Sequence, residues 1–344
     1  MNPVVRERLF GVHSAFDHPV VLGVVVAAAA ALLIAPLAVW LLARAGRLAP
    51  ETRRELYLRI FTWALLMPLL LGPILLGAAW VILGVLALSL LCYREYARLT
   101  GLFREKMMSL VVVVGIVLVS FAIFDHWYGF FAALAPLGVA TIAAVGLLGD
   151  RPQGYIQRLA LAVLAFALFG IGLGHLAYFA NDTNYRAILV LLLVAVALND
   201  VFAYLSGKTI GGPRLCPHTS PNKTIGGAVG ALVLTTALVC LLGRLVFADQ
   251  PMGQWHHLLA LGLLISVAGQ FGDLMLSAVK RDIGVKDIGH TLPGHGGLLD
   301  RFDSLLLVAP TVYHYVGYIQ GVGLDQPTNL FTEAAAWATS LISP

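Results

Sequence analysis

The chain has 344 residues, of which 59% are hydrophobic and 12% are charged, and its mean hydropathy is +0.87. A soluble domain carries about 25% charged residues, so this composition excludes an ordinary soluble protein and indicates an integral membrane protein. The 22 basic residues barely exceed the 18 acidic ones, an excess too small to predict a nucleic-acid partner.

The N-terminal region predicts a retained membrane span and no cleaved leader. Its apolar run, about residues 19–43, is longer than the roughly 7–15 residues of a signal-peptide core. The three cysteines, Cys92, Cys216 and Cys240, are widely spaced without a CxxC pair, which argues against a disulfide framework or a zinc site.

Apolar runs of about 20 residues, the length of a spanning helix, recur along the chain. They predict an all-α polytopic membrane protein with about ten transmembrane helices. The predicted spans are about 19–43, 58–74, 75–93, 107–124, 128–148, 158–179, 187–206, 224–247, 256–279 and 302–320. The second and third require a tight turn at Gly72-Pro73, and one long kinked helix is the alternative.

Basic residues predict the orientation, because lysine and arginine accumulate in cytoplasmic loops. With the N-terminus outside, 18 of the 22 fall in predicted inside loops. The protein is therefore expected in the bacterial inner membrane, with polar loops 206–224 and 280–301 in the cytoplasm. The expected regions are N-terminal helices (1–190), a catalytic region with both loops (191–320) and a tail (321–344).

The stretch 272–303, GDLMLSAVKRDIGVKDIGHTLPGHGGLLDRFD, gathers five aspartates, four basic side chains and two histidines after an apolar run. Carboxylates bind hard divalent cations, and cations with glycine-rich backbone bind phosphates. The mixture predicts metal-assisted chemistry on a phosphate at a membrane boundary.

Two aspartates, Asp200 and Asp273, follow apolar runs. A charged side chain inside a span costs about 2.5–3.5 kcal/mol on insertion scales, so such residues usually face a cavity and have a partner. A solvated helix end is the alternative for both. Asp300 and Asp303 share a helix face at spacing i, i+3, although acidic residues also favour any helix start.

The other polar loop places Ser220, Lys223 and Thr224 at the start of an apolar helix, where phosphate binding is favoured. Gly226 and Gly227 allow a ligand or another helix to approach the backbone. The GxxxxGK[ST] order of a P-loop is absent, and a simple N-capped span is the alternative. In the later stretch, His295 is expected to orient a phosphate or carboxylate, and His290 to be a loop residue.

These residues resemble the CDP-diacylglycerol synthases, also called phosphatidate cytidylyltransferases, over about residues 195–310. Their pattern S-x-x-K-R-x4-K-D-x-G-x-x-[LI]-P-G-H-G-G-x-x-D-R-x-D is matched from Ser277 to Asp303. Asp200 to Lys208 match D-x-x-A-Y-x-x-G-K, and Ser220 to Gly227 match S-P-x-K-T-x-x-G.

The resemblance implies transfer of a cytidylyl group from CTP to phosphatidic acid, giving CDP-diacylglycerol and pyrophosphate with Mg²⁺ or another divalent cation. A second cation and a homodimer are left open, and membrane lipids are expected partners. The implied metal ligands are Asp273 and Asp300, with Asp200 and Asp303 nearby. The implied catalytic set is Asp273, Asp300, Lys223, Lys280, Arg281, Lys286 and His295. The implied substrate-binding set is Ser220, Lys223, Thr224, Asp287, Gly296, Gly297 and Arg301.

Two departures distinguish this chain from that family's usual pattern. Leu276 stands where G-D-L-x-E-S has glutamate, and Ile225 and Gly226 replace tryptophan and glutamate or glutamine. Leucine cannot bind a metal, so a ligand is lost or replaced.

Two rival functions remain compatible with the sequence. The first is a CTP-dependent kinase, or a cytidylyltransferase, acting on a different lipid. The second is a transporter, which intramembrane aspartates allow. However, the charges gather at one face, and no inverted repeat is visible.

Overall fold

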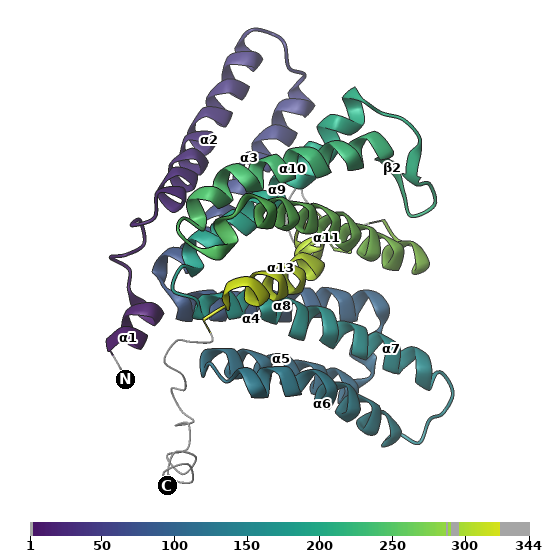
Figure 1. The fold of residues 1–344 in the computed structure, drawn as a ribbon. Coiled ribbons are helices and arrows are strands. Elements are labelled where there is room, and N and C mark those ends of the chain that lie inside the picture. Colours follow the sequence, from purple (N-terminus) through teal and green to yellow (C-terminus); the bar gives the residue numbers. More distant parts are fainter. Residues whose placement is uncertain (1–2, 287, 290–295, 324–344) are drawn as a thin grey trace. The chain divides into compact units, whose positions relative to one another are not determined.

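The structure, a computed structural model, describes residues 3–286, 288, 289 and 296–323 (Figure 1). The predicted site residues Asp287 and His295, together with His290, lie outside the described residues, as does most of the predicted tail. The described chain divides into two compact units. The first unit combines segments of residues 1–11, 77–185 and 305–344, and the second combines residues 12–76 and 186–304.

The first unit is a helical bundle with an aromatic core. Its helices α4, α5 and α6 pack in sequence, and α8 packs on α4, α5 and α13. Tyr96 and Phe169 meet edge to face with ring centroids 5.4 Å apart. The elements are α1 (Pro3–Phe10), α4 (Ala78–Thr100), η1 (Leu102–Arg104), α5 (Lys106–Phe124), α6 (Tyr128–Leu147), α7 (Tyr155–Ala165), the π-helix η2 (Phe166–Gly172), α8 (Leu173–Tyr178), η3 (Phe179–Asn181) and α13 (Leu305–Gln320).

The second unit contains the helices that carry the predicted polar loops. Its elements are α2 (Pro19–Arg44), α3 (Pro50–Leu76), α9 (Tyr185–Thr209, from Arg186), β1 (Arg214–Cys216), β2 (Ser220–Thr224), α10 (Ile225–Val246), η4 (Pro251–Gly253), α11 (Trp255–Asp282) and α12 (Leu299–Phe302). Strands β1 and β2 form an antiparallel hairpin in which Arg214 pairs with Thr224 and Cys216 with Ser220. The hairpin lies within the predicted 206–224 loop and was not predicted.

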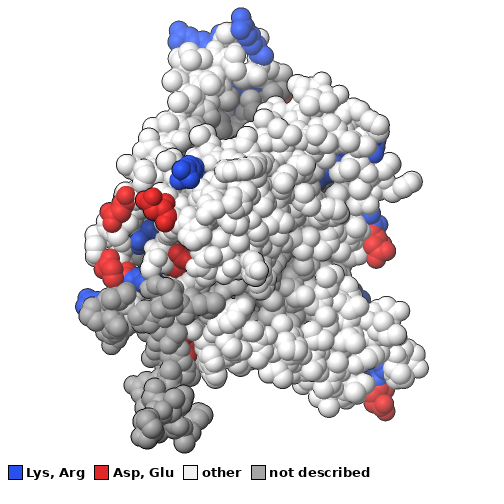
Figure 2. All heavy atoms as spheres, viewed as in Figure 1, with Lys and Arg blue, Asp and Glu red and all other residues white. Residues whose placement is uncertain are grey.

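The all-α membrane architecture is confirmed. Nine helical segments among the described residues are long and apolar enough to span a membrane. They are α2 to α6, the segment Tyr155–Asn181, and α9 to α11. The predicted span at 302–320 corresponds to α13, whose 16 residues extend about 24 Å at 1.5 Å per residue. The mostly uncharged surface in Figure 2 agrees with a protein embedded in lipid.

The predicted turn at Gly72-Pro73 is wrong. Helix α3 continues through both Pro68 and Pro73, and the chain breaks instead at Gly77. Gly77 has a φ of 132°, a backbone conformation that glycine tolerates and side-chain-bearing residues rarely adopt. The two predicted spans are therefore separate helices, but the break between them is at Gly77 and not at Gly72-Pro73.

Glycines bring α9 and α10 into close contact below the polar loops. A side chain at Gly227 would place its Cβ 2.6 Å from the Ala203 carbonyl oxygen, and one at Gly230 would overlap Ser206. Asn199 on α9 links three helices, because its Oδ1 accepts hydrogen bonds from Thr235 on α10 (2.9 Å) and Ser266 on α11 (2.7 Å). These contacts fix the helices that bear the functional side chains.

Candidate active site

A polar cavity of about 690 Å³ lies within the second unit; we call it the site pocket. Its walls come from α9, the β1–β2 hairpin, α10, α11 and the segment around α12. The predicted site residues that line it are Asp200, Ser220, Lys223, Thr224, Asp273, Lys280, Asp300, Arg301 and Asp303. Residues separated by as many as 103 positions in the sequence therefore meet in one cavity, as a shared site requires.

Two lysine–aspartate pairs cross the site pocket. Lys223 Nζ lies 2.5 Å from Asp273 Oδ2, joining β2 to α11. Lys280 Nζ lies 2.7 Å from Asp300 Oδ1, joining α11 to α12. The second pair is more enclosed, with 12% and 9% of the two side chains exposed. Both pairs place basic nitrogens where anionic groups of a ligand would compete with carboxylates.

Asp300 is held by its backbone surroundings as well as by Lys280. Its Oδ2 accepts hydrogen bonds from the Ile288 N–H (3.1 Å) and the Gly297 N–H (3.2 Å). Gly296 has a φ of 81°, and a Cβ there would stand 3.5 Å from the same oxygen. Gly296 and Gly297 therefore lie against the carboxylate, and the positive φ explains glycine at position 296.

Asp303 is the most buried carboxylate of the site pocket, with 6% of its surface exposed. It lies ahead of α13 and accepts a hydrogen bond from the Ser304 N–H (2.7 Å). Burial, followed by the neighbouring carboxylates of Asp273 and Asp200, raises the pKa of Asp303 well above its ordinary value. Ionising all the carboxylates of this cavity together is therefore unfavourable, and a bound cation would offset that cost.

The carboxylates suit Mg²⁺ in kind, since this ion prefers oxygen ligands and one or two carboxylates alongside phosphate oxygens. Across the described part of the chain, however, no three acidic, histidine or cysteine side chains are placed to hold one ion together. Asp273 and Asp300 are each engaged by a lysine. Incoming phosphates would attract those lysines and release carboxylate oxygens for a cation.

Thr224 has a structural role that the sequence offered as an alternative. Its Oγ1 accepts a hydrogen bond from the Gly227 N–H (3.1 Å) and caps α10. The hydroxyl still lines the site pocket and keeps its own proton to donate. Capping and ligand binding are therefore compatible at this residue.

Two predicted basic residues, Arg281 and Lys286, do not line the site pocket. Arg281 Nε instead donates to the Thr219 carbonyl (3.3 Å), and its Nη1 donates to the Val285 carbonyl (3.4 Å). Lys286 is exposed. Arg281 thus ties the β1–β2 hairpin to the end of α11, while its predicted contact with phosphate stays a prediction.

Ten further residues of the site pocket were not predicted as site residues, among them Tyr204, Lys208, Arg214 and Gln270. Lys208 Nζ lies 4.4 Å from the centroid of the Tyr204 ring, a cation–π contact. Helical spacing could have found this pair, because positions 200, 204 and 208 repeat every fourth residue on one face of α9. Gln270 similarly precedes Asp273 by one turn of α11.

Both departures from the resembling pattern have a structural explanation. Leu276 is fully buried and does not line the site pocket, so leucine here packs the core. Gly226 donates its N–H to the Gly211 carbonyl (3.1 Å), and a Cβ at Gly226 would collide with that same oxygen. The loop after α9 therefore occupies the space that a larger residue at position 226 would need.

Comparison with known proteins identifies relatives of this chain. A family model for the cytidylyltransferase family matches residues 57–319. An uncharacterized protein of Escherichia coli (strain K12), YnbB, is 35% identical over 280 residues, which cover 79% of this chain and 91% of that protein.

Two similar proteins carry the name phosphatidate cytidylyltransferase. The one from Staphylococcus aureus (strain COL) is 41% identical over 157 residues, 45% of this chain and 59% of the relative. The one from Staphylococcus saprophyticus subsp. saprophyticus is 42% identical over 151 residues, 44% of this chain and 56% of the relative. These matches thus span less than two thirds of either relative.

Proposed function

The chain belongs to the cytidylyltransferase family, and from this premise we propose that it transfers a cytidylyl group from CTP to phosphatidic acid. The products would be CDP-diacylglycerol and pyrophosphate. The observation that carries the proposal is the site pocket, where four aspartates and five basic side chains line one cavity in a membrane protein. Such mixed charge suits two anionic reactants that must approach each other.

The proposed reaction is attack of a lipid phosphate oxygen on the α-phosphorus of CTP, with pyrophosphate leaving. Repulsion between the anionic reactants is the main obstacle, so catalysis needs positioning and electrostatic stabilisation more than a protein nucleophile. A phosphate monoester is already a competent nucleophile near neutral pH. This chemistry agrees with a pocket rich in lysine, arginine and carboxylates.

The lysines are proposed to bind phosphate. Lys223 and Lys280 would exchange their aspartate partners for phosphate oxygens, and Arg301 lines the same cavity. The short pairing distances of 2.5 Å and 2.7 Å show that both amino groups reach the carboxylates that line the cavity. Both lysines therefore already point into the cavity, but an anion must displace an aspartate to bind them.

The aspartates are proposed to hold a divalent cation, Mg²⁺ in the simplest case. Asp273 and Asp300 would be ligands, with Asp200 and Asp303 beside them. When bound, the ion would neutralise phosphate charge and orient the α-phosphate. All four carboxylates line the same cavity, which supports a cation-binding role.

The proposed location is a bacterial inner membrane, with the site pocket open to the cytoplasm and to CTP. Some of the basic residues that predict this orientation, such as Lys208, Arg214 and Lys280, line the pocket itself. Cysteines introduced at exposed positions 212 and 286 should react with a membrane-impermeant maleimide only after the cytoplasmic side is opened. Labelling of both in intact cells would contradict the orientation.

The decisive assay incubates purified full-length protein with CTP labelled at the α-phosphate, Mg²⁺ and a panel of lipid acceptors. Transfer of label to phosphatidic acid with release of pyrophosphate is expected. Release of CDP would instead identify a kinase, and labelling of another lipid alone would identify a different acceptor. If no product forms, solute counterflow in liposomes that contain only this protein would indicate transport.

A further inference from the structure

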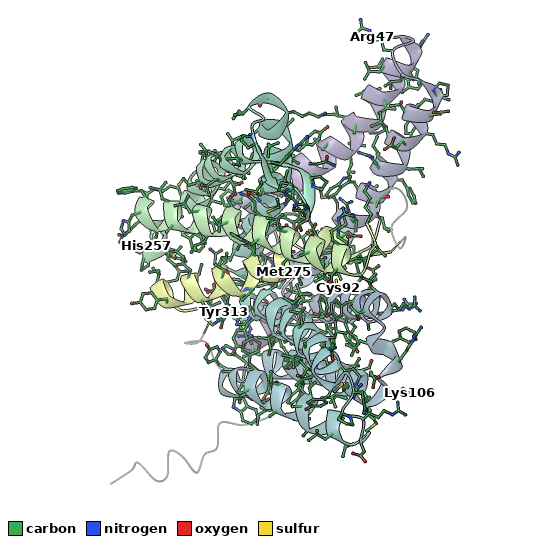
Figure 3. All side chains as sticks on the ribbon, turned by 90° about the vertical axis from the view of Figure 1, so that its right-hand side faces the viewer. Arg47, Cys92, Lys106, His257, Met275 and Tyr313 are labelled. Carbon is green, nitrogen blue, oxygen red and sulfur yellow. The ribbon has the colours of Figure 1, made fainter. Side chains whose placement is uncertain are left out.

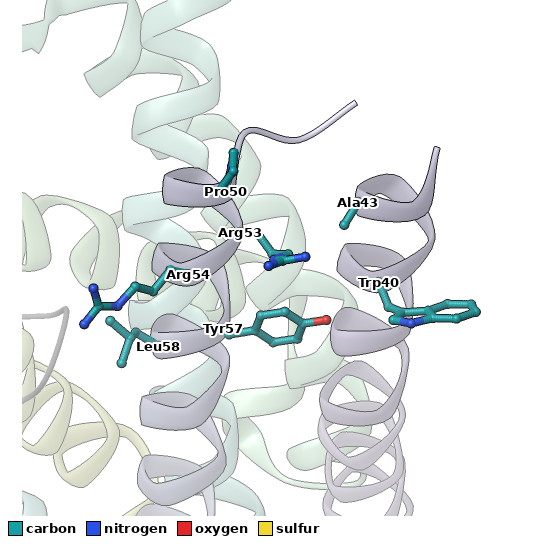
Figure 4. A pocket seen from close by; sticks show the side chains of 7 residues that line it. All are labelled: Trp40, Ala43, Pro50, Arg53, Arg54, Tyr57 and Leu58. Atoms are coloured by element: carbon teal, nitrogen blue, oxygen red, sulfur yellow. The ribbon is translucent and has the colours of Figure 1, made fainter. Parts of the chain in front are cut away.

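A second cavity, of about 600 Å³, lies at the connected ends of α2 and α3; we call it the arginine pocket. None of its lining residues belongs to the site pocket. Its walls include Trp40, Pro50, Arg53, Arg54 and Tyr57, and Figure 4 shows how they lie on the two helices. The proposed transfer reaction makes no use of this cavity.

The surroundings of the arginine pocket carry excess positive charge. Residues 44–59 contain five arginines and two glutamates, which leaves three positive charges. Glu55 is engaged by Arg59, with 2.5 Å between oxygen and nitrogen. Figure 2 shows basic side chains gathered at the top of the view, where Figure 1 places the ends of α2 and α3. The pocket therefore attracts an anion.

The arrangement of side chains favours a phosphate group. Arg53 and Tyr57, one helical turn apart, extend from α3 toward α2 in Figure 4, so a guanidinium and a hydroxyl face the same gap. The Arg44 guanidinium carbon lies 5.3 Å from the centroid of the Trp40 ring. One guanidinium group can donate two parallel hydrogen bonds to two phosphate oxygens, and a tyrosine hydroxyl can donate one more.

Apolar surface continues from the pocket along both helices. Leu33 and Ile34 on α2 are 75% and 62% exposed, and Phe61 on α3 is 63% exposed. Only 11% of the apolar window of α2 is buried inside the protein, against 61% for the segment Tyr155–Asn181. If α2 and α3 span the membrane, this surface meets acyl chains. A ligand with an anionic headgroup and apolar tails would therefore match both the arginine pocket and the apolar surface beside it.

We propose that the arginine pocket binds the phosphate headgroup of an anionic phospholipid from the surrounding bilayer, with its acyl chains along α2 and α3. Arg53 and Tyr57 hold the phosphate in the gap between the two helices, and Arg54, on the other side of α3, adds positive charge nearby. Such binding is independent of cytidylyl transfer and holds whichever lipid the site pocket uses.

The test measures lipid retention by the purified full-length protein. Native mass spectrometry with added phosphatidylglycerol should show about tenfold weaker binding for the double variant Arg53→Gln/Arg54→Gln. The matched control, Arg47→Gln/Arg59→Gln, removes the same charge from the same segment but leaves the residues that line the pocket unchanged. Figure 3 labels Arg47 in the connection between α2 and α3. It should change binding less than about twofold.

Three outcomes would overturn the proposal. Equal losses in both double variants would show unspecific attraction to a basic segment. Equal retention of phosphatidylcholine would show that headgroup charge is irrelevant. Displacement of phosphatidylglycerol by millimolar inorganic phosphate would indicate a site for soluble anions. Arg53→Lys tests the role of the guanidinium itself, because lysine keeps the charge but cannot form two parallel hydrogen bonds to a phosphate. The affinity of this variant for phosphatidylglycerol should lie between those of the wild type and the double variant.

Discussion

The site pocket and the arginine pocket both present basic side chains to a space that suits a phosphate, yet they differ in what accompanies the bases. In the site pocket, Lys223 and Lys280 are paired with carboxylates. No acidic residue is among the described lining of the arginine pocket. An anion can therefore bind the arginines directly, whereas in the site pocket it must compete with aspartates or arrive with a cation.

This difference separates binding from catalysis. A purely basic cavity holds an anion with little dependence on other ions, apart from screening by salt. A cavity with both signs can rearrange, because each lysine has two alternative partners and each carboxylate can exchange a lysine for a cation. Charged and polar side chains that are already in place around the reacting atoms lower the energetic cost of rearranging the site during the reaction.

Removal of divalent cations should affect the site pocket far more than the arginine pocket. We expect EDTA to reduce cytidylyl transfer by at least about 1000-fold, because the aspartates would otherwise repel both phosphates. Retention of phosphatidylglycerol by the arginine pocket should change less than about twofold under the same conditions. Transfer that continues at its normal rate after chelation would remove the cation from the proposed mechanism.

The substitution Asp273→Asn should nearly abolish turnover. The amide keeps the shape of the side chain but loses the charge that pairs with Lys223 and is proposed to bind the cation. A loss of about 100- to 1000-fold in kcat is expected, as for removal of a single preorganised electrostatic group. The control is Asp282→Asn at the exposed end of α11, outside the site pocket. Comparable activity in the two variants would contradict the role of Asp273.

The substitution Lys223→Ala should weaken the use of CTP by a smaller factor. Charge-assisted hydrogen bonds to phosphate contribute about 1.5–3 kcal/mol, so kcat/KM for CTP should fall about 10- to 150-fold. Lys223→Arg keeps the charge and should recover part of the loss. Lys106→Ala, at the start of α5 in the first unit, provides the control. Steady-state kinetics unchanged by Lys223→Ala would show that this lysine serves only to pair Asp273.

Much of the membrane architecture could be predicted from apolar runs alone. The spans predicted at 19–43 and 128–148 agree closely with α2 and α6. The Gly72-Pro73 turn failed because a helix in lipid can accommodate proline, so a Gly-Pro pair is weaker evidence for a break there than in a soluble protein. The β1–β2 hairpin escaped prediction because strands of three and five residues, one reading SPNKT, carry no alternating apolar pattern.

The membership of the site pocket could also be predicted in large part, but its pairings could not. Charge clustering and spacing identified Asp200, Asp273 and Asp300, which line one cavity. Nothing in the order of residues specifies that Lys223 pairs with Asp273 while Lys280 pairs with Asp300. Those partners lie 50 and 20 positions apart, and only the folded chain brings β2 to α11 and α12 to the end of α11.

The smallest effect concerns the close packing of α9 against α10, which supports the site pocket. Gly230→Val should clash with Ser206 and push α10 away from α9, at a cost of about 1–3 kcal/mol. Gly23→Val on α2 is the matched control, because a Cβ at Gly23 meets nothing within 4 Å.

Thermal unfolding in detergent should therefore show a lower midpoint for Gly230→Val and little change for Gly23→Val. Because α9 carries Asp200 and α10 follows Lys223, the same clash should also lower turnover at temperatures where the variant remains folded. Equal midpoints would mean that α9 and α10 have room to separate, and that the aspartates and lysines of the site pocket do not depend on this contact for their spacing.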